Sequence, residues 1–262
     1  MSNPTAPAAT QWTARRSLHT VGLLACAALL SACGKPADPA TAPAEAAASA
    51  PAAAAPAPRA VDQLFTPEAI GMNLAYVEKI AGPAVRSDDH RHLYRVDGCE
   101  LTLRTDDADK AVQVVEVAVT PSCQLSLEPL ISTFAGTPPL QLDTLTMGSF
   151  HDKLGGAYYA DCLSMCGNAA DPVVSLVVEG PRALQLMEFA LEVPLVDGPA
   201  LDAAEQWRSA MQQAESEDYV LDGRFNCEPQ RFQSVVAPGF AAVKPARFIF
   251  GHGLAFESGE CD

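Results

Sequence analysis

The sequence is poor in positive charge, in aromatic residues and in long hydrophobic runs. Lys and Arg number 17 against 32 Asp and Glu, a formal net charge of −15, and aromatic residues make up 6% of the chain. Because phosphate binding needs clustered positive charge, this balance excludes a typical nucleic-acid-binding surface and argues against docking on anionic lipid. The apolar run at 21–30 is too short for a bilayer-spanning anchor, which takes about 20 residues.

The first 32 residues have the pattern of an export signal. Arg15 and Arg16 precede the apolar run, and no Asp or Glu occurs before residue 33. A basic start, a short apolar core and small residues after it are typical of a bacterial secretory signal. The Arg pair faintly resembles a twin-arginine signal, but the rest of that motif is missing, so general secretion is the better interpretation.

The end of this segment, Leu30-Ser31-Ala32-Cys33, resembles the lipobox of bacterial lipoproteins. The resemblance implies cleavage before Cys33, diacylglycerol on its thiol and acylation of the new amino group. Several acyl chains would anchor the protein durably in a membrane. Gly34 stands where an Asp commonly retains lipoproteins in the inner membrane, so we expect the periplasmic face of the outer membrane.

Residues 33–60 are expected to form a tether. Fourteen of these positions are Ala and six are Pro, so few side chains can be buried and no continuous helix can form. Such a linker is extended, with a maximal reach of roughly 85 Å at about 3.1 Å per residue.

Six cysteines remain after removal of the signal and lipidation of Cys33. An even number in an exported protein indicates disulfides, although six cysteines allow 15 pairings. We expect nearest-neighbour pairing: Cys99–Cys123, Cys162–Cys166 and Cys227–Cys261. For the second pair a zinc or redox role is the alternative. No second ligand pair of similar spacing is visible, and a thioredoxin-like motif has two intervening residues where this chain has three.

Residues 61–136 are expected to form a small α+β unit. Thr66-Pro67 predicts a helix start, and Asn73 predicts the cap of a second helix at 74–81, stopped by Gly82-Pro83. Strand-like runs at 92–96, 99–104 and 111–119 follow, the first two joined by the hairpin dipeptide Asp97-Gly98. Helices beside an antiparallel meander make an α+β fold.

The run Ile70-Gly71-Met72-Asn73, the short helix, Gly82-Pro83 and Tyr94 on a strand resemble the BamE-like (SmpA/OmlA) lipoproteins. This resemblance covers roughly residues 65–120 and implies two helices on a three-stranded antiparallel sheet. It also implies a role in outer-membrane barrel assembly, from which this chain departs by its acidity, its cysteines and its further residues. Secreted β-lactamase inhibitors share the scaffold in duplicate, so the fold alone does not fix the function.

Residues 137–262 are expected to form a second α+β unit, also stabilised by disulfides. Strands are predicted at 173–178, 184–195, 219–225 and 247–250, with a helix from 198 to about 213. The stretch from Cys166 to Pro172, within the loop that begins at Cys162, is the most unusual one, because Gly, Asn and Asp-Pro supply turn geometry. It is expected to be a structural loop or a partner-binding loop, with Asn168 and Asp171 as candidate binding residues.

No catalytic constellation emerges from the sequence. Asp107 and Asp109 lack the glycine and distal Glu of a calcium loop, the segment 87–92 is expected to be a solvated loop, and His252 has no assignable partner. We therefore expect no catalytic residues, no metal and no cofactor. The sequence favours a non-catalytic lipoprotein that binds another periplasmic or envelope protein. The alternatives are an inhibitor or immunity lipoprotein that neutralises a secreted hydrolase, for which the acidic charge favours a basic target, and a hydrolase with an unrecognised site.

Overall fold

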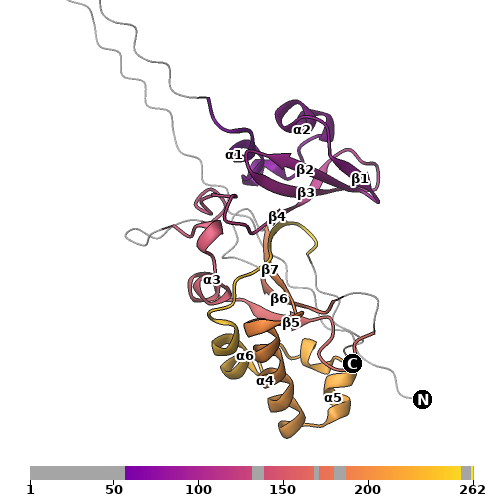
Figure 1. The fold of residues 1–262 in the computed structure, drawn as a ribbon. Coiled ribbons are helices and arrows are strands. Elements are labelled where there is room, and N and C mark those ends of the chain that lie inside the picture. The colour runs from indigo at the N-terminus through magenta and orange to yellow at the C-terminus, as the bar shows by residue number, and fades with distance from the viewer. Residues whose placement is uncertain (1–56, 132–138, 168–170, 180–186, 255–260, 262) are drawn as a thin grey trace, which may run out of the picture. The chain divides into compact units, whose positions relative to one another are not determined.

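A computed structural model describes residues 57–131, 139–167, 171–179, 187–254 and 261. They form an α+β fold with one eight-stranded antiparallel sheet and six α-helices (Figure 1). None of the described helices is long and apolar enough to cross a bilayer. The predictions for the signal, for Cys33 and for the tether up to residue 56 lie outside the described residues.

Short helices precede each of the two meanders, and three further α-helices lie between the second meander and the last strand. The strands are β1 Arg86–Asp88, β2 Arg91–Val96, β3 Cys99–Thr105, β4 Val112–Ala118, β5 Ala157–Ala160, β6 Val173–Val178, β7 Glu188–Pro194 and β8 Arg247–Gly251. The helices are α1 Ala60–Leu64, α2 Leu74–Ala81, α3 Met147–Leu154, α4 Gly198–Ala214, α5 Glu217–Leu221 and α6 Gln233–Phe240.

The sheet has the order β1-β2-β3-β4-β8-β7-β6-β5. One meander, β2–β4, follows α2, and a second meander, β5–β7, follows α3. The last strand, β8, lies between them and pairs antiparallel with both β4 and β7. The segments expected to form two α+β units therefore contribute strands to one sheet.

Local sequence signals explain the start of each meander. The Asn73 side chain accepts a hydrogen bond of 2.9 Å from the backbone N–H of Ala75 and caps α2. Thr146 and Ser149 form a reciprocal capping box at α3. Asp97 and Gly98 both have positive φ, as expected for the predicted hairpin turn. Gly251 lies so close to β4 that a Cβ would collide with the backbone of Gln113 and Val114.

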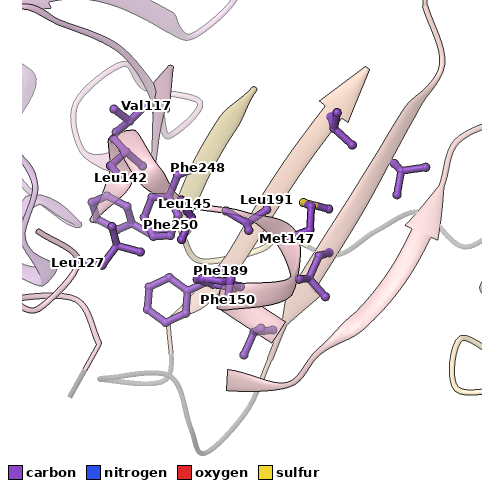
Figure 2. Packing of buried hydrophobic residues seen from close by; sticks show 14 of the residues in the cluster. Val117, Leu127, Leu142, Leu145, Met147, Phe150, Phe189, Leu191, Phe248 and Phe250 are labelled. Carbon is purple, nitrogen blue, oxygen red and sulfur yellow. The ribbon is translucent and has the colours of Figure 1, made fainter. Parts of the chain in front are cut away.

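One face of the sheet is covered by helices and carries the hydrophobic core. Its buried strand residues alternate with the residues of the other face; they are Tyr94, Leu101, Leu103, Val115, Val117, Tyr158, Val174, Leu176, Phe189, Leu191, Phe248 and Phe250. Phe248 lies among Phe150, Phe189 and Phe250 (Figure 2). Its ring centroid is 6.0 Å from that of Phe150, 6.0 Å from that of Phe189 and 5.7 Å from that of Phe65. The core spans both meanders, so the two halves are stabilised together.

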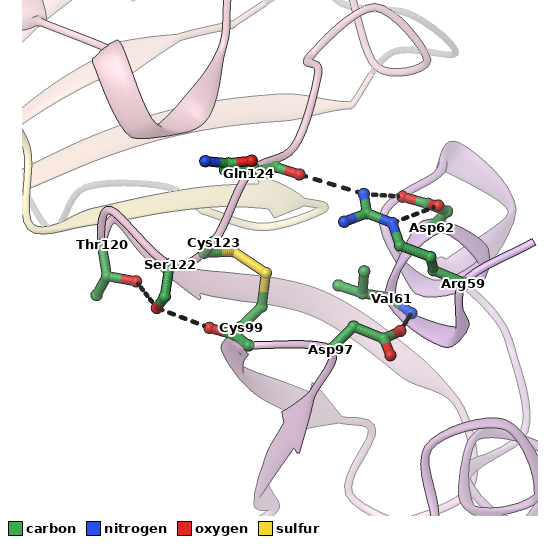
Figure 3. The surroundings of a disulfide bond; sticks show 10 residues. Arg59, Val61, Asp62, Asp97, Cys99, Thr120, Ser122, Cys123 and Gln124 are labelled. Atoms are coloured by element: carbon green, nitrogen blue, oxygen red, sulfur yellow. Dashed lines mark hydrogen bonds and ion pairs between the residues drawn. A yellow bond between two sulfur atoms is a disulfide. The ribbon is translucent and has the colours of Figure 1, made fainter.

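The cysteines lie at disulfide distance in the three pairs expected from nearest-neighbour pairing. The Cα–Cα distances are 4.6 Å for Cys99–Cys123, 5.7 Å for Cys162–Cys166 and 5.6 Å for Cys227–Cys261. Around the first pair, Ser122 donates to the Gly98 carbonyl and the Asp97 carboxylate accepts from the Val61 N–H (Figure 3). The first disulfide thus fixes the β2–β3 turn against the segment that follows β4.

One local prediction was wrong, and a second was confirmed only in part. The segment 219–225 is not a strand, because Ser216 caps α5 by accepting from the Tyr219 N–H at 3.2 Å. Tyr219, Val220 and Phe225 are buried from helical turns instead of from a sheet. The helix start at Thr66-Pro67 is confirmed in position, with Thr66 at the N-cap and Pro67 first, but the element is a three-residue 3₁₀ helix, Pro67–Ala69, without a side-chain cap hydrogen bond.

Candidate functional site

The sheet face opposite the helices carries the charged strand residues. The strands in the described part of the chain contain five arginines and no lysine. All five arginines occupy this face: Arg86, Arg91, Arg95, Arg104 and Arg247. Lysines, by contrast, lie in helices, turns and loops of the described chain, as at Lys79 and Lys110. Arginine is enriched and lysine depleted at protein interfaces, so this segregation marks the open face as a candidate contact surface.

Three arginines and two glutamates on this face form two neighbouring ion-paired groups, called together the guanidinium cluster: Arg91, Arg104 and Glu116 in one, and Arg247 and Glu192 in the other. The two groups are close enough for the charges of Glu116 and Arg104 to act on Glu192. Arg91 Nη2 donates to Glu116 Oε2 at 2.7 Å. Arg104 Nε forms an ion pair with Glu116 Oε1 at 3.1 Å, without hydrogen-bond geometry. Arg247 Nη2 lies 2.8 Å from Glu192 Oε2. The cluster crosses β2, β3, β4, β8 and β7.

The register explains why these side chains meet. Arg91 lies opposite Arg104 across β2–β3, and Arg247 lies opposite Glu192 across β8–β7. Burial raises the pKa of Glu192, an effect that the neighbouring Arg247 opposes. The side chain of Glu116 is only 7% exposed and that of Glu192 is 23% exposed. Both carboxylates therefore form the floor of the cluster.

A hollow of about 380 Å³ adjoins the guanidinium cluster at the β1 edge of the sheet. It is lined by Arg86, Asp88, Asp89, Arg91, Leu93 and Thr102. Arg86 and Asp88 are paired at 2.8 Å. Both charge signs and one aliphatic side chain thus surround a space large enough for a few side chains of a binding partner.

The loop predicted to bind a partner begins at β5, at the other end of the strand order from β1–β3. Asp171 is exposed, and Asn168 lies outside the described residues. The Asp161 carboxylate accepts from the N–H groups of Cys162 and Val173, both at 2.7 Å, and so closes the base of the loop. Met165, which the sequence analysis did not select, has a φ of 53° and is 84% exposed.

A second polar group joins the β1–β2 turn to the turn before β4. His90 Nδ1 lies 2.7 Å from Asp109 Oδ1, His92 Nε2 lies 3.4 Å from the same oxygen, and Thr105 donates to it at 2.7 Å. The hydrogen bond to Asp109 raises the pKa of His90. Hydrogen bonds from Thr105 and His90 lower the pKa of Asp109 to about 2. The segment 87–92, expected to be a solvated loop, instead forms β1 and the start of β2.

The polar side chains of the guanidinium cluster and of the group around Asp109 pair with one another and do not converge on a common vacant position. Across the described ranges, no group of three His, Cys, Asp or Glu is arranged to hold a metal ion. Exposed His252 follows β8, and its backbone N–H donates to the Gln113 carbonyl at 3.1 Å. Comparison with protein-family models, with curated proteins and with solved structures finds no match.

Proposed function

We propose that this chain is a lipid-anchored, periplasm-facing outer-membrane lipoprotein that acts as a non-catalytic protein-binding module, and that its open sheet face is the binding surface. The single observation that carries the proposal is the guanidinium cluster. Arginines held in place by buried carboxylates lose little side-chain entropy on contact, which favours binding. A lipid on Cys33 and the Ala/Pro-rich tether would let the module reach a partner away from the membrane surface.

The arrangement of α2 with β2–β4 supports the finer version of this proposal, in which the module is an envelope-assembly accessory. The BamE-like resemblance implies two helices on a three-stranded antiparallel sheet, and α1 and α2 precede the meander β2–β4. The resemblance extends no further than that unit, so the partner is identified here only as another envelope or periplasmic protein.

Site-specific cross-linking in intact membranes tests the proposed surface. A photoreactive benzophenone residue replaces Thr102 on the open face, and in a matched variant it replaces exposed Gln206 on α4. The proposal predicts one discrete protein adduct at position 102 and none at 206. Absence of a protein adduct from position 102 and from every other exposed position tried would refute a protein-binding role.

The anchor is tested separately. Cys33→Ser should release the protein from membranes or block its processing, because the thiol that would carry the lipid is gone. A Cys33→Ser protein that fractionates with membranes as the wild type does would refute the anchoring part of the proposal.

Met165 favours a second candidate function, an inhibitor or immunity lipoprotein for a secreted hydrolase. A positive φ is unusual for methionine, and an exposed apolar side chain on a disulfide-closed loop is a suitable plug for an apolar subsite. In that case a benzophenone at position 165 should capture a secreted hydrolase, and Met165→Ala with Asp171→Ala should relieve its inhibition. An adduct at 102 alone would argue against this alternative.

A further inference from the structure

We infer that the partner docks on the guanidinium cluster through carboxylate side chains, so that its contacting segment is acidic. This inference rests on the proposed function, because it assigns the chemistry of the partner at the same surface. It is opposite in sign to the expectation from net charge, since a chain of −15 would select a basic partner. The local arrangement of charge in the guanidinium cluster favours an acidic partner over a basic one.

The outermost charge of the guanidinium cluster is positive. The side chains of Arg91, Arg104 and Arg247 are 44%, 36% and 45% exposed. The glutamates beneath them are largely covered, as described above. A partner therefore meets guanidinium groups first, and the cluster itself holds three positive charges against two negative ones.

The donors of the cluster exceed its acceptors. Arg91 and Arg104 share one carboxylate, whereas each guanidinium carries five N–H donors. Like charges directly opposite on neighbouring strands destabilise a sheet, and Arg91 and Arg104 are such a pair. A carboxylate arriving from outside would accept from the planar donor forks and relieve that repulsion.

The surroundings favour a protein segment over an anionic lipid surface or a nucleic acid. Those extended anions would meet the negative charge of the whole chain, whereas an acidic segment brings carboxylates only to the contact. The adjoining hollow supplies Leu93 and Thr102 for the aliphatic parts of such a segment. Of the two carboxylates that line it, that of Asp88 is paired with Arg86 at 2.8 Å.

The test uses the full chain in its membranes, with the photoreactive residue at position 102. The variant R91Q/R104Q/E116Q removes the three charges while keeping side-chain shape, and R95Q/E100Q is the matched control, because Arg95 and Glu100 form an exposed pair at 3.1 Å on the same face. The urea unfolding midpoint of each variant is measured first. Should the triple variant unfold early, R247Q/E192Q replaces it, because that pair belongs to the same cluster.

The inference predicts an adduct that maps by mass spectrometry to an Asp- or Glu-rich segment. Its yield should fall about tenfold or more in R91Q/R104Q/E116Q and should stay at the wild-type level in R95Q/E100Q. A protein adduct that maps to a segment without carboxylates, or that survives the triple variant, overturns the inference and leaves the protein-binding function standing. A phospholipid adduct also overturns it. No protein adduct at any surface position refutes both.

Discussion

The two faces of the sheet differ in kind although the same strands build them. On the helix-covered face the alternate residues of β2 to β8 are buried and almost all apolar, with His92 as the polar member. On the open face the intervening positions carry five arginines together with Glu116 and Glu192. They also carry a smaller buried apolar cluster, Val114, Val177, Ala190 and Ile249. Period-two alternation thus places the main hydrophobic core on one face and the half-exposed arginines of the guanidinium cluster on the other.

The largest expected effect lies on the helix-covered face. Phe248→Ala should lower the free energy of unfolding by about 3–5 kcal/mol, because it leaves a cavity among four aromatic rings. Its neighbour on the other face provides the control: Arg247→Ala should cost about 1 kcal/mol or less, since that side chain is half-exposed. Urea denaturation of both variants measures the difference, and equal costs would contradict the division between the faces.

The edge of the sheet is expected to be the next most sensitive region. The Asn226 side chain accepts from the Ala160 N–H at 3.1 Å and donates to the Ala160 carbonyl at 2.8 Å, so it takes the place of a neighbouring strand on β5. Asn226→Ala should cost about 2–3 kcal/mol, because two buried backbone groups lose their partners. Asn73→Ala, at an exposed helix cap, should cost about 1 kcal/mol. Equal unfolding midpoints in urea for the two variants would contradict a stabilising role of the Asn226 side chain at the β5 edge.

The open face should be tolerant of charge removal only when its buried carboxylate is removed too. R91Q/R104Q should cost about 2 kcal/mol, because Glu116 is left covered without its cations. Adding E116Q should restore the unfolding free energy to within about 1 kcal/mol of the wild type. A triple variant less stable than the double variant would show that Glu116 is not held by these arginines.

The smallest effect concerns pH. His90 has a raised pKa, so its contribution to stability is complete below its unfolded value of about 6.5 and is lost as the pH rises through the higher folded value. The carboxylate of Asp109 stays ionised down to about pH 2, and Asp89 and Asp107 also face the imidazole. Thermal unfolding at about pH 5.5 and about pH 8 should therefore differ less in His90→Gln than in the wild type. An unchanged difference would contradict the pairing.

Local signals in the sequence predict a good part of this fold. The helix at 74–81, the hairpin at Asp97-Gly98 and the long helix from residue 198 appear where capping, turn and periodic patterns indicate them. The strand prediction at 219–225 was wrong because aromatic and aliphatic residues there are compatible with a strand. The Ser216 cap instead stabilises a helix. Short strands such as β1 and β5 carry too few residues for a periodic pattern to be recognised.

The guanidinium cluster could not be predicted from local signals in the sequence. Alternation places Arg91 and Arg95 on one face of their strand, but the meeting of Arg91 with Arg104 depends on the β2–β3 register. The position of Arg247 and Glu192 beside this group depends on β8 inserting between β4 and β7, a long-range pairing without a local signal. The loop at Cys162–Cys166, by contrast, was visible as a candidate because its turn residues are contiguous.

The most direct test of the division between the two faces is a paired measurement on R91Q/R104Q/E116Q. The free energy of unfolding and the yield of the protein adduct at position 102 are determined on the same protein. The account predicts an unfolding free energy within about 1 kcal/mol of the wild type together with loss of the adduct. A stable variant that still forms the adduct, or an adduct lost only in step with stability, would contradict it.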